Sequence, residues 1–420
     1  MGVGGELDGA YDLLPEVPPP ADGSPWAAPT PVEQRLYDLV RSGDTDGYRR
    51  VLAAEGLYHF MRPADTHASP RRRRRIMVPR HEGRRVYPVY TQGMLPPPES
   101  DTVMEFIPLH HLSLILPVFG GRRADALVVN PKTPCEMVLP VTLDERGAWK
   151  RLHRELFDNR RLANRIVTLR DGTPGTPGQG ALLHGMACGA HLCYVNGDTW
   201  NTVDYHGGGY SAGRRSLRNW WGVGGRADWL RVQRSLLDTE ASPWFWDFVL
   251  SARTALERKN GAPVDPVAWR DRVADAVRAR ASGAVPGDPR VERAVATVTG
   301  LVGKVLRYEA RFRADGLLPP GGVVRTIAAW DLGRASAMAR WARGARYAHE
   351  LEMISALEAA SAAARNRYRT WSGFSAGYVL GRCLHFDEER FGPWYTEMLA
   401  AHRALTTGDD SPWRIVTFLD

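Results

Sequence analysis

The sequence predicts an α+β protein in which a mixed α/β sheet domain precedes a larger all-α domain. Short apolar runs with a period of two are confined to residues 57–141, whereas amphipathic helical stripes fill most of the chain after residue 180. A Gly/Pro-rich stretch at residues 171–180, DGTPGTPGQG, separates the two parts and is typical of a linker. We therefore expect a disordered tail at 1–29, an α/β domain at 30–142, a bridging helix with the linker at 143–180, and an all-α domain at 181–420.

The first domain is expected to begin with two short helices and to continue with strands. Pro and Gly dominate residues 1–29, which predicts disorder. Thr30-Pro31-Val32-Glu33 then combines a capping box with Pro at the first helical position, and Asp44 can cap a second helix. Strands are predicted at 57–61, 86–91, 104–107, 126–130 and 137–141, with a short helix at 110–116.

The rest of the chain shows helix signals. A capping box at Thr142 opens the bridging helix, and Asp265-Pro266 and Asp288-Pro289 are each an N-cap residue followed by Pro. The glycines at 207–209 follow His206 but lack the pattern of a phosphate-binding loop, so we expect a simple connection there. A compact all-α domain is the fold that these signals favour.

The amino-acid composition limits the classes of protein to which this chain can belong. The net charge is +8, and only four of the 55 basic residues are Lys, an Arg bias typical of a GC-rich, actinobacterial-type genome. Four cysteines are too few for a disulfide scaffold in 420 residues. The N-terminus lacks the basic and apolar regions of a signal peptide, and no apolar run reaches membrane-spanning length. We expect a cytoplasmic protein without a membrane span.

One polar cluster is expected inside the all-α domain. Asp331 falls in an apolar helical stripe, where an unpaired carboxylate is costly, so it needs a cationic partner. Arg334 lies one turn further on, but Arg382 is the preferred partner because it would join two helices that are distant in sequence. Trp330 and Trp371 complete this predicted cluster, whose role we expect to be structural rather than chemical.

Two other groups of residues could bind a ligand. His184, Cys188 and His191 have the spacing of one helix face and are weak candidates for a metal site, although close packing of a buried helix explains them better. An arginine run, Arg71, Arg72, Arg73, Arg74 and Arg75, could contact phosphates, although a solvated loop is the simpler explanation. No catalytic motif and no cofactor fingerprint is recognisable, so we predict no catalytic residues and no cofactor.

The chain resembles two bacterial families. The segments Ala329-Trp330-Asp331-Leu332-Gly333-Arg334, Trp371-Ser372 and Tyr378-Val379-Leu380-Gly381-Arg382, together with Trp221-Gly222-Val223, resemble the domain of unknown function 1266 family, which includes YbeU-like and YbeR-like proteins. That likeness covers about residues 180–418. The first domain resembles the N-terminal domain of SseB-type proteins through its paired short helices, Leu57-Tyr58, Pro88-Val89-Tyr90-Thr91 and Val128-Val129-Asn130-Pro131. Here Tyr90 stands where that family tends to have Phe.

The resemblance implies an adaptor or regulatory role. We expect a non-catalytic interaction protein with a protein partner, in an immunity-like role or in association with a bacterial secretion or conflict system. The alternatives are nucleic-acid binding through Arg71–Arg75 and a metal-dependent enzyme at His184, Cys188 and His191. The sequence does not indicate an oligomeric state.

Overall fold

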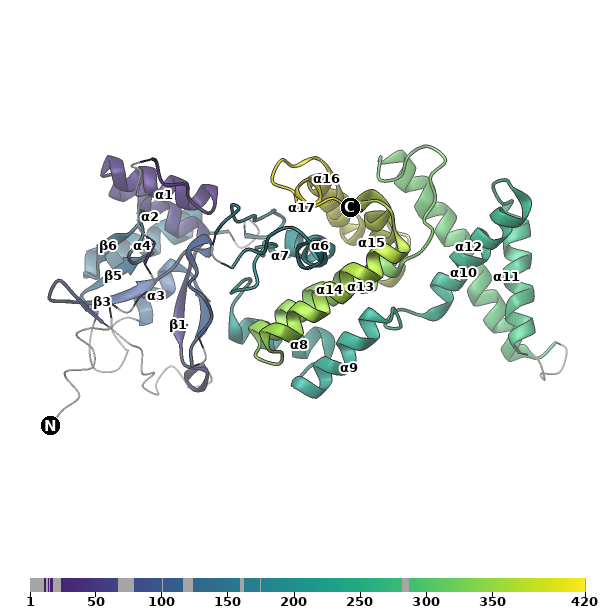
Figure 1. Ribbon diagram of the computed structural model, residues 1–420, viewed down its shortest axis with the longest axis horizontal. Helices are drawn as coiled ribbons and strands as arrows, with labels where there is room; N and C mark the ends of the chain where they lie inside the picture. The colour runs from purple at the N-terminus through teal and green to yellow at the C-terminus, as the bar shows by residue number, and fades with distance from the viewer. Residues whose placement is uncertain are drawn as a thin grey trace. The chain divides into compact units, whose positions relative to one another are not determined.

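The computed structural model describes residues 11–419 except 13, 15, 18–23, 67–78, 100, 116–123, 159–161, 174 and 282–286. The chain forms two compact units (Figure 1). The first comprises Met1–Gly178, Asn196–Gly224 and Trp341–Tyr347, and the second comprises Gln179–Val195, Gly225–Arg340 and Ala348–Asp420. Small sheets lie in the first unit and the second is helical, so the predicted α+β class is confirmed.

The first unit contains two sheets. β1 (Leu57–Met61) and β4 (Val103–Ile107) form an antiparallel pair, and a four-stranded sheet has the order β2-β3-β5-β6. Its strands are β2 (Arg80–His81), β3 (Arg84–Val89), β5 (Ala126–Val129) and β6 (Met137–Pro140). β3 and β5 are parallel, whereas β2 with β3 and β5 with β6 are antiparallel. All five predicted strands are therefore present, and only the two-residue β2 was missed.

Alternation along β5 places its side chains on two faces of the sheet. Leu127 and Val129 join the core that contains Leu36 of α1 and Trp149 of α4. The helices of this unit are α1 (Pro31–Ser42), α2 (Thr45–Glu55), α3 (Leu109–Ile115), α4 (Leu143–Leu156) and α8 (Tyr210–Trp221), with 3₁₀ turns η1 (Pro63–Asp65) and η2 (Gln92–Met94). The predicted N-caps are present: the side chains of Thr30, Asp44 and Thr142 each accept a hydrogen bond from a backbone N–H of the first turn. The two predicted capping boxes are incomplete, because Glu33 accepts from the Gly93 N–H and Glu145 pairs with Arg49 instead.

Part of the segment expected to be a disordered tail is packed in the first unit. Tyr11 and Leu14 lie against Ala126 and Val128 on the second face of the sheet. The Tyr11 hydroxyl donates to Glu136 Oε2 at 2.6 Å. The prediction of disorder was wrong for these residues, because the sheet offers an apolar face that they cover.

The loop and helix at 196–224 also belong to the first unit, although the sequence analysis assigned them to the all-α domain. Residues 197–209 are not helical. The Tyr58 hydroxyl donates to the Gly207 carbonyl at 2.9 Å, and the Ser211 N–H donates to Glu105 Oε1 at 2.9 Å. These contacts bring the chain back to the strands after the linker, an arrangement that local sequence signals do not reveal.

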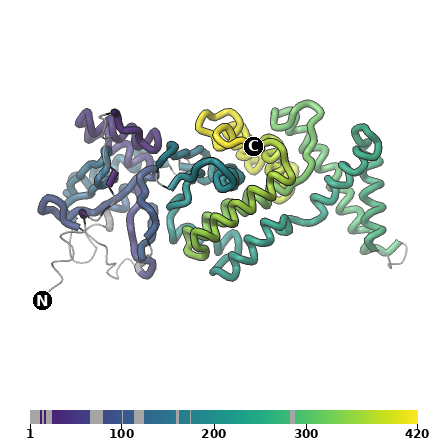
Figure 2. Tube along the Cα trace, in the orientation of Figure 1, coloured from purple at the N-terminus to yellow at the C-terminus, as the bar shows by residue number. Residues whose placement is uncertain are grey.

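The second unit is built from helices joined by short connections. Helices α10, α11 and α12 pack against one another, and the path of the chain through them can be followed in Figure 2. Its helices are α6 (Ala181–Cys188), α7 (Ala190–Asn196), α9 (Arg226–Leu237), α10 (Trp244–Asn260), α11 (Pro266–Arg280), α12 (Pro289–Ala314), α13 (Ala328–Gly344), α14 (Glu350–Arg367), α15 (Trp371–Phe386), α16 (Pro393–Thr407) and α17 (Pro412–Ile415). Among the described residues, no helix is both long and apolar enough to cross a membrane.

Candidate functional site

Asp331 is buried in the first turn of α13, as its position in the apolar stripe predicted. Its carboxylate forms an ion pair with Arg334, whose side chain is 11% exposed. Ser242, just before α10, supplies two further donors: its hydroxyl lies 2.7 Å from Oδ1 and its backbone N–H lies 3.1 Å from Oδ2. Burial lowers the pKa of Arg334, and the neighbouring carboxylate opposes that shift. Both carboxylate oxygens of Asp331 therefore have a hydrogen-bond donor, which favours a structural role.

The preferred partner Arg382 was the wrong choice. Its guanidinium donates to Glu397 Oε2 on α16 at 2.6 Å. Among the described residues, Arg334 is therefore the cation that pairs with Asp331.

Trp371 lies in a different aromatic group from Trp330. Its ring stacks on Trp413 at 5.5 Å and on His184 at 4.8 Å, and its indole N–H donates to the Val416 carbonyl at 2.7 Å. It holds the C-terminal segment against α6 and α15 and takes no part in the Asp331 cluster.

A thermodynamic cycle tests this corrected pairing. Asp331→Ala leaves Arg334 buried without its partner, and we expect a loss of about 3–5 kcal/mol of unfolding free energy. The effect of Asp331→Ala should be coupled to that of Arg334→Ala and additive with that of Arg382→Ala. Urea unfolding of the full chain measures all three variants and both double variants. Strong coupling between Asp331→Ala and Arg382→Ala would instead show that Arg382 is the partner of Asp331, as the sequence predicted.

Next to this cluster, aromatic side chains from three helices reach the surface of the second unit. Consecutive ring centroids lie 4.3–6.5 Å apart from the start of α10, across the end of α15, to the start of α16. The buried ring of Trp246 links the two ends, and Trp330 contacts the α15 rings from inside. We define the aromatic surface as the exposed and half-exposed rings of this series: Trp244, Phe245, Phe248, His385, Phe386 and Trp394.

Arginines accompany these rings. Arg280 lies over Trp244 with 4.8 Å between the guanidinium carbon and the ring centroid, and Arg382 lies over Trp394 at 5.0 Å. Trp244 is 57% exposed and Trp394 is 40% exposed, so both large rings present apolar area to solvent. Cation–π contact restrains their orientation without covering them.

The candidate metal ligands do not share one helix. α6 ends at Cys188, Gly189 interrupts the hydrogen-bonding pattern, and a new helix carries His191. His184 and Cys188 remain one turn apart, with 3.9 Å between Nδ1 and Sγ. Burial raises the pKa of the Cys188 thiol, which keeps it protonated and opposes ligation as a thiolate. Among the described residues, no group of three or more His, Cys, Asp or Glu side chains is placed to hold a metal ion.

The two histidines instead hydrogen-bond to serines of other helices. His184 Nδ1 lies 3.0 Å from Ser361 Oγ, and His191 Nε2 lies 3.0 Å from Ser375 Oγ. The His191 ring also stacks on Tyr378 with centroids 4.1 Å apart. Burial lowers the pKa of His191 well below its usual range, so its imidazole is neutral at physiological pH. These contacts are those of core histidines. The arginine run at 71–75 lies outside the described residues.

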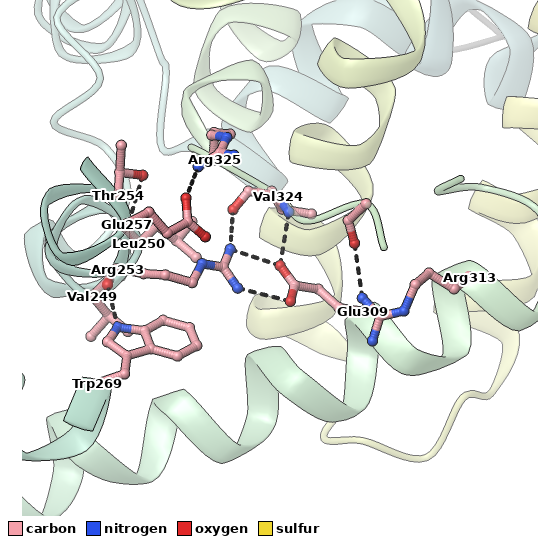
Figure 3. Close-up of polar contacts among 11 residues, drawn as sticks. Val249, Leu250, Arg253, Thr254, Glu257, Trp269, Glu309, Arg313, Val324 and Arg325 are labelled. Atoms are coloured by element: carbon pink, nitrogen blue, oxygen red, sulfur yellow. Dashed lines mark hydrogen bonds and ion pairs between the residues drawn. The ribbon is translucent and has the colours of Figure 1, made fainter. Parts of the chain in front are cut away.

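Figure 3 shows a buried polar group that the sequence analysis missed. Arg253 of α10 donates two hydrogen bonds of 2.8 Å to the carboxylate of Glu309 on α12. Both also bind the peptide groups of Val324, in the segment that leads into α13: Glu309 accepts from its N–H and Arg253 donates to its carbonyl. The guanidinium lies 4.5 Å from the Trp269 ring. Glu309 interrupts the apolar stripe of α12, and that signal could have identified it as it identified Asp331.

Comparison with known proteins bears on the helical region alone. No curated protein and no solved structure matches the chain. Residues 216–418 match the family model described as "Protein of unknown function (DUF1266)", so the C-terminal helical region is similar to that family.

Proposed function

We propose that the protein acts without catalysis, by binding a protein partner through the aromatic surface of its second unit. The observation that carries this proposal is the set of exposed and half-exposed rings on α10, α15 and α16, which are linked through buried Trp246 and flanked by arginines. Tryptophan, tyrosine and arginine are the residues in which the binding energy of protein interfaces is concentrated. Exposed aromatic area in a patch of this kind marks an interaction site more often than isolated apolar residues do.

The same geometry argues against base stacking at this surface. Phe386 already stacks on the ring of Trp394 with 4.7 Å between centroids and an interplanar angle of 19°. Arg382 lies against the same ring and is itself paired with Glu397. Single-stranded nucleic acid requires open ring faces and cations that are available to phosphates. A protein partner needs only the exposed ring edges and the apolar area around them.

The finer parts of the proposal follow from the resemblances in the sequence. We propose an SseB-like role for the first unit and a YbeU-like or YbeR-like one for the second, and a regulatory or immunity-like task in the cytoplasm. All four cysteines are buried thiols that form no disulfide with one another, which supports a reducing compartment. Nucleic-acid binding through Arg71–Arg75 and a metal-dependent activity remain predictions from the sequence alone.

Surface substitutions test the binding role. Trp244→Ser and Trp394→Ser together should abolish specific recovery of the partner, because truncating a central aromatic at an interface typically costs about 2 kcal/mol or more per residue. The measurement is quantitative affinity purification from the native cells with wild-type and variant chains. Leu351→Ser is the matched control, since Leu351 is 78% exposed and belongs to the same unit but not to the aromatic surface.

The double variant should remain folded, with at most a small drop in melting temperature, because Trp244 is 57% and Trp394 40% exposed in the folded state. The proposal fails if proteins recovered with the wild type are recovered equally with the Trp244→Ser/Trp394→Ser chain. It also fails if the Leu351→Ser control loses them to the same extent.

A further inference from the structure

Three imidazole rings and a phenyl ring form a stack between α3 and α4 in the first unit. The ring centroid of His110 on α3 lies 3.6 Å from that of His153 on α4 and 4.1 Å from that of His111. The His153 ring in turn stacks on Phe157, at the end of α4, with 4.4 Å between centroids. Apolar rings would fill the same space, so packing alone does not require groups that titrate.

The stack lies beside the side chains with which α3 covers the core of the first unit. Leu109 and Leu112 of α3 are fully buried and belong to the same core as Trp149 of α4. Since α3 has seven residues, contacts with its neighbours stabilise it more than its own hydrogen bonds do. A change of charge in the stack therefore acts on a helix that depends on these contacts.

The charges that act on the two central rings are positive. His111, His153 and Lys150 each disfavour a proton on His110, and His111 disfavours one on His153. Within the part of the chain that the structure describes, no carboxylate is among the charges that shift the pKa of either ring. A protonated imidazole in this stack thus meets repulsion.

The neighbouring carboxylates of α4 pair with arginines of α2 instead. Arg49 lies 2.5 Å from Glu145 and Arg50 lies 2.6 Å from Glu155. On α2, Asp46 also pairs with Arg49, and Glu55 pairs with Arg165. The other charged residues of α4 are Asp144, Arg146, Arg151 and Arg154. The charged groups on the elements that pack against α3 therefore do not supply a free anion to the imidazoles.

Burial and these positive neighbours make protonation unfavourable while α3 is packed. Burial is the largest cause that lowers the pKa of His110 from 6.5 to about 4, and it also lowers the pKa of His153. A histidine that leaves the stack regains its ordinary pKa and takes up a proton. The contact between α3 and α4 is therefore fully stable above about pH 6.5 and weakens as the pH falls towards 4.

A cluster of histidines could also suggest a metal site, but the arrangement of these rings does not favour ligation. Stacked imidazoles turn their faces, and not their nitrogen atoms, towards one another. The described side chains include no group of three or more His, Cys, Asp or Glu that could hold a metal ion. Proton uptake is the chemistry that remains for the stack.

We propose that the imidazole stack of His110, His111 and His153 is a pH-sensitive contact that releases α3 from α4 under mildly acidic conditions. Protonation of a central ring places a positive charge against a second imidazole and near Lys150, so repulsion opposes the stacking. Release uncovers Leu109 and Leu112 and opens the core beside α4. This conformational change in the first unit is separate from the binding surface proposed for the second.

Hydrogen–deuterium exchange of the full chain tests the release. Protection of the α3 amides, corrected for the pH dependence of chemical exchange, should fall about tenfold between pH 7 and pH 5, which allows for screening of partly exposed rings. His110→Phe/His153→Phe keeps two stacked rings without their charge, so its protection should change much less. Equal protection of wild-type α3 at both pH values overturns the proposal, and so does an equal loss in the wild type and the double variant.

Lys150→Gln tests the electrostatic cause without altering the rings. Lys150 is exposed, so the variant should fold as the wild type does. Loss of its charge should raise the pKa of His110, measured by nuclear magnetic resonance of the imidazole during a pH titration, and should reduce the acid-induced loss of α3 protection. Lys304→Gln, an exposed change on α12, is the matched control and should alter neither. An unchanged His110 pKa in the Lys150→Gln chain, or an equal change with Lys304→Gln, contradicts the proposal.

Discussion

Glu309→Ala is expected to cost the full chain about 3–5 kcal/mol of unfolding free energy, because it leaves a buried guanidinium without its carboxylate. Arg253 is 5% exposed and Glu309 is 1% exposed as side chains, so water cannot replace the lost partner. The substitution also removes the acceptor of the Val324 N–H, which loosens the segment that leads into α13. Urea unfolding of the full chain, followed by circular dichroism, measures the loss.

An exposed pair of the same geometry provides the control. Arg278 and Glu292 also form two hydrogen bonds, both of 2.9 Å, but their side chains are 48% and 44% exposed. Solvent screens such a pair, so Glu292→Ala should leave the unfolding transition nearly unchanged. An equal loss of unfolding free energy for Glu309→Ala and Glu292→Ala would show that burial does not determine how much these ion pairs stabilise the protein.

Gly185→Val is the second substitution with a large expected effect. α6 and α14 pack so closely that a Cβ at Gly185 would overlap the Leu357 carbonyl, which is backbone and cannot rotate away. Overpacking of this kind typically costs about 1–3 kcal/mol, and the larger valine should exceed the cost of alanine. The melting temperature of the full chain measures the effect.

Gly300→Ala is the matched control for this position. Gly300 is an exposed residue inside α12, and an added Cβ would meet no heavy atom within 4 Å. Alanine should therefore stabilise the helix by about 0.5–1 kcal/mol. If Gly185→Ala were tolerated as well as Gly300→Ala, the close approach of α6 and α14 would not determine this part of the fold.

Local sequence signals were sufficient to predict most helices and strands. They did not identify which distant side chains pair with each other. Strands β1, β3 and β5 follow from period and composition, and the caps at Thr30 and Asp265 need only neighbouring residues. The partner of Asp331 depends on how α13 and α15 meet. The stripe showed that a partner was needed, and it could not distinguish one turn of the same helix from a second helix.

The candidate sites in the structure differ from those predicted from the sequence, again because they depend on contacts between distant helices. His184 and His191 have the spacing of one helix face, but the break at Gly189 sends them to different neighbours. The aromatic surface was missed because exposure of Trp244 and Trp394 is decided by packing between three helices. The sequence shows an aromatic residue, and only the fold shows whether it is covered.

Photo-crosslinking shows whether a partner protein contacts the aromatic surface. A photoreactive phenylalanine derivative replaces Trp394 in one chain and Leu351 in another, and both are illuminated in the native cells. We expect a discrete covalent adduct with one protein from position 394, and none of comparable yield from position 351. A contrary result would be equal adducts from both positions, or no adduct at 394 in a chain that is folded and normally abundant.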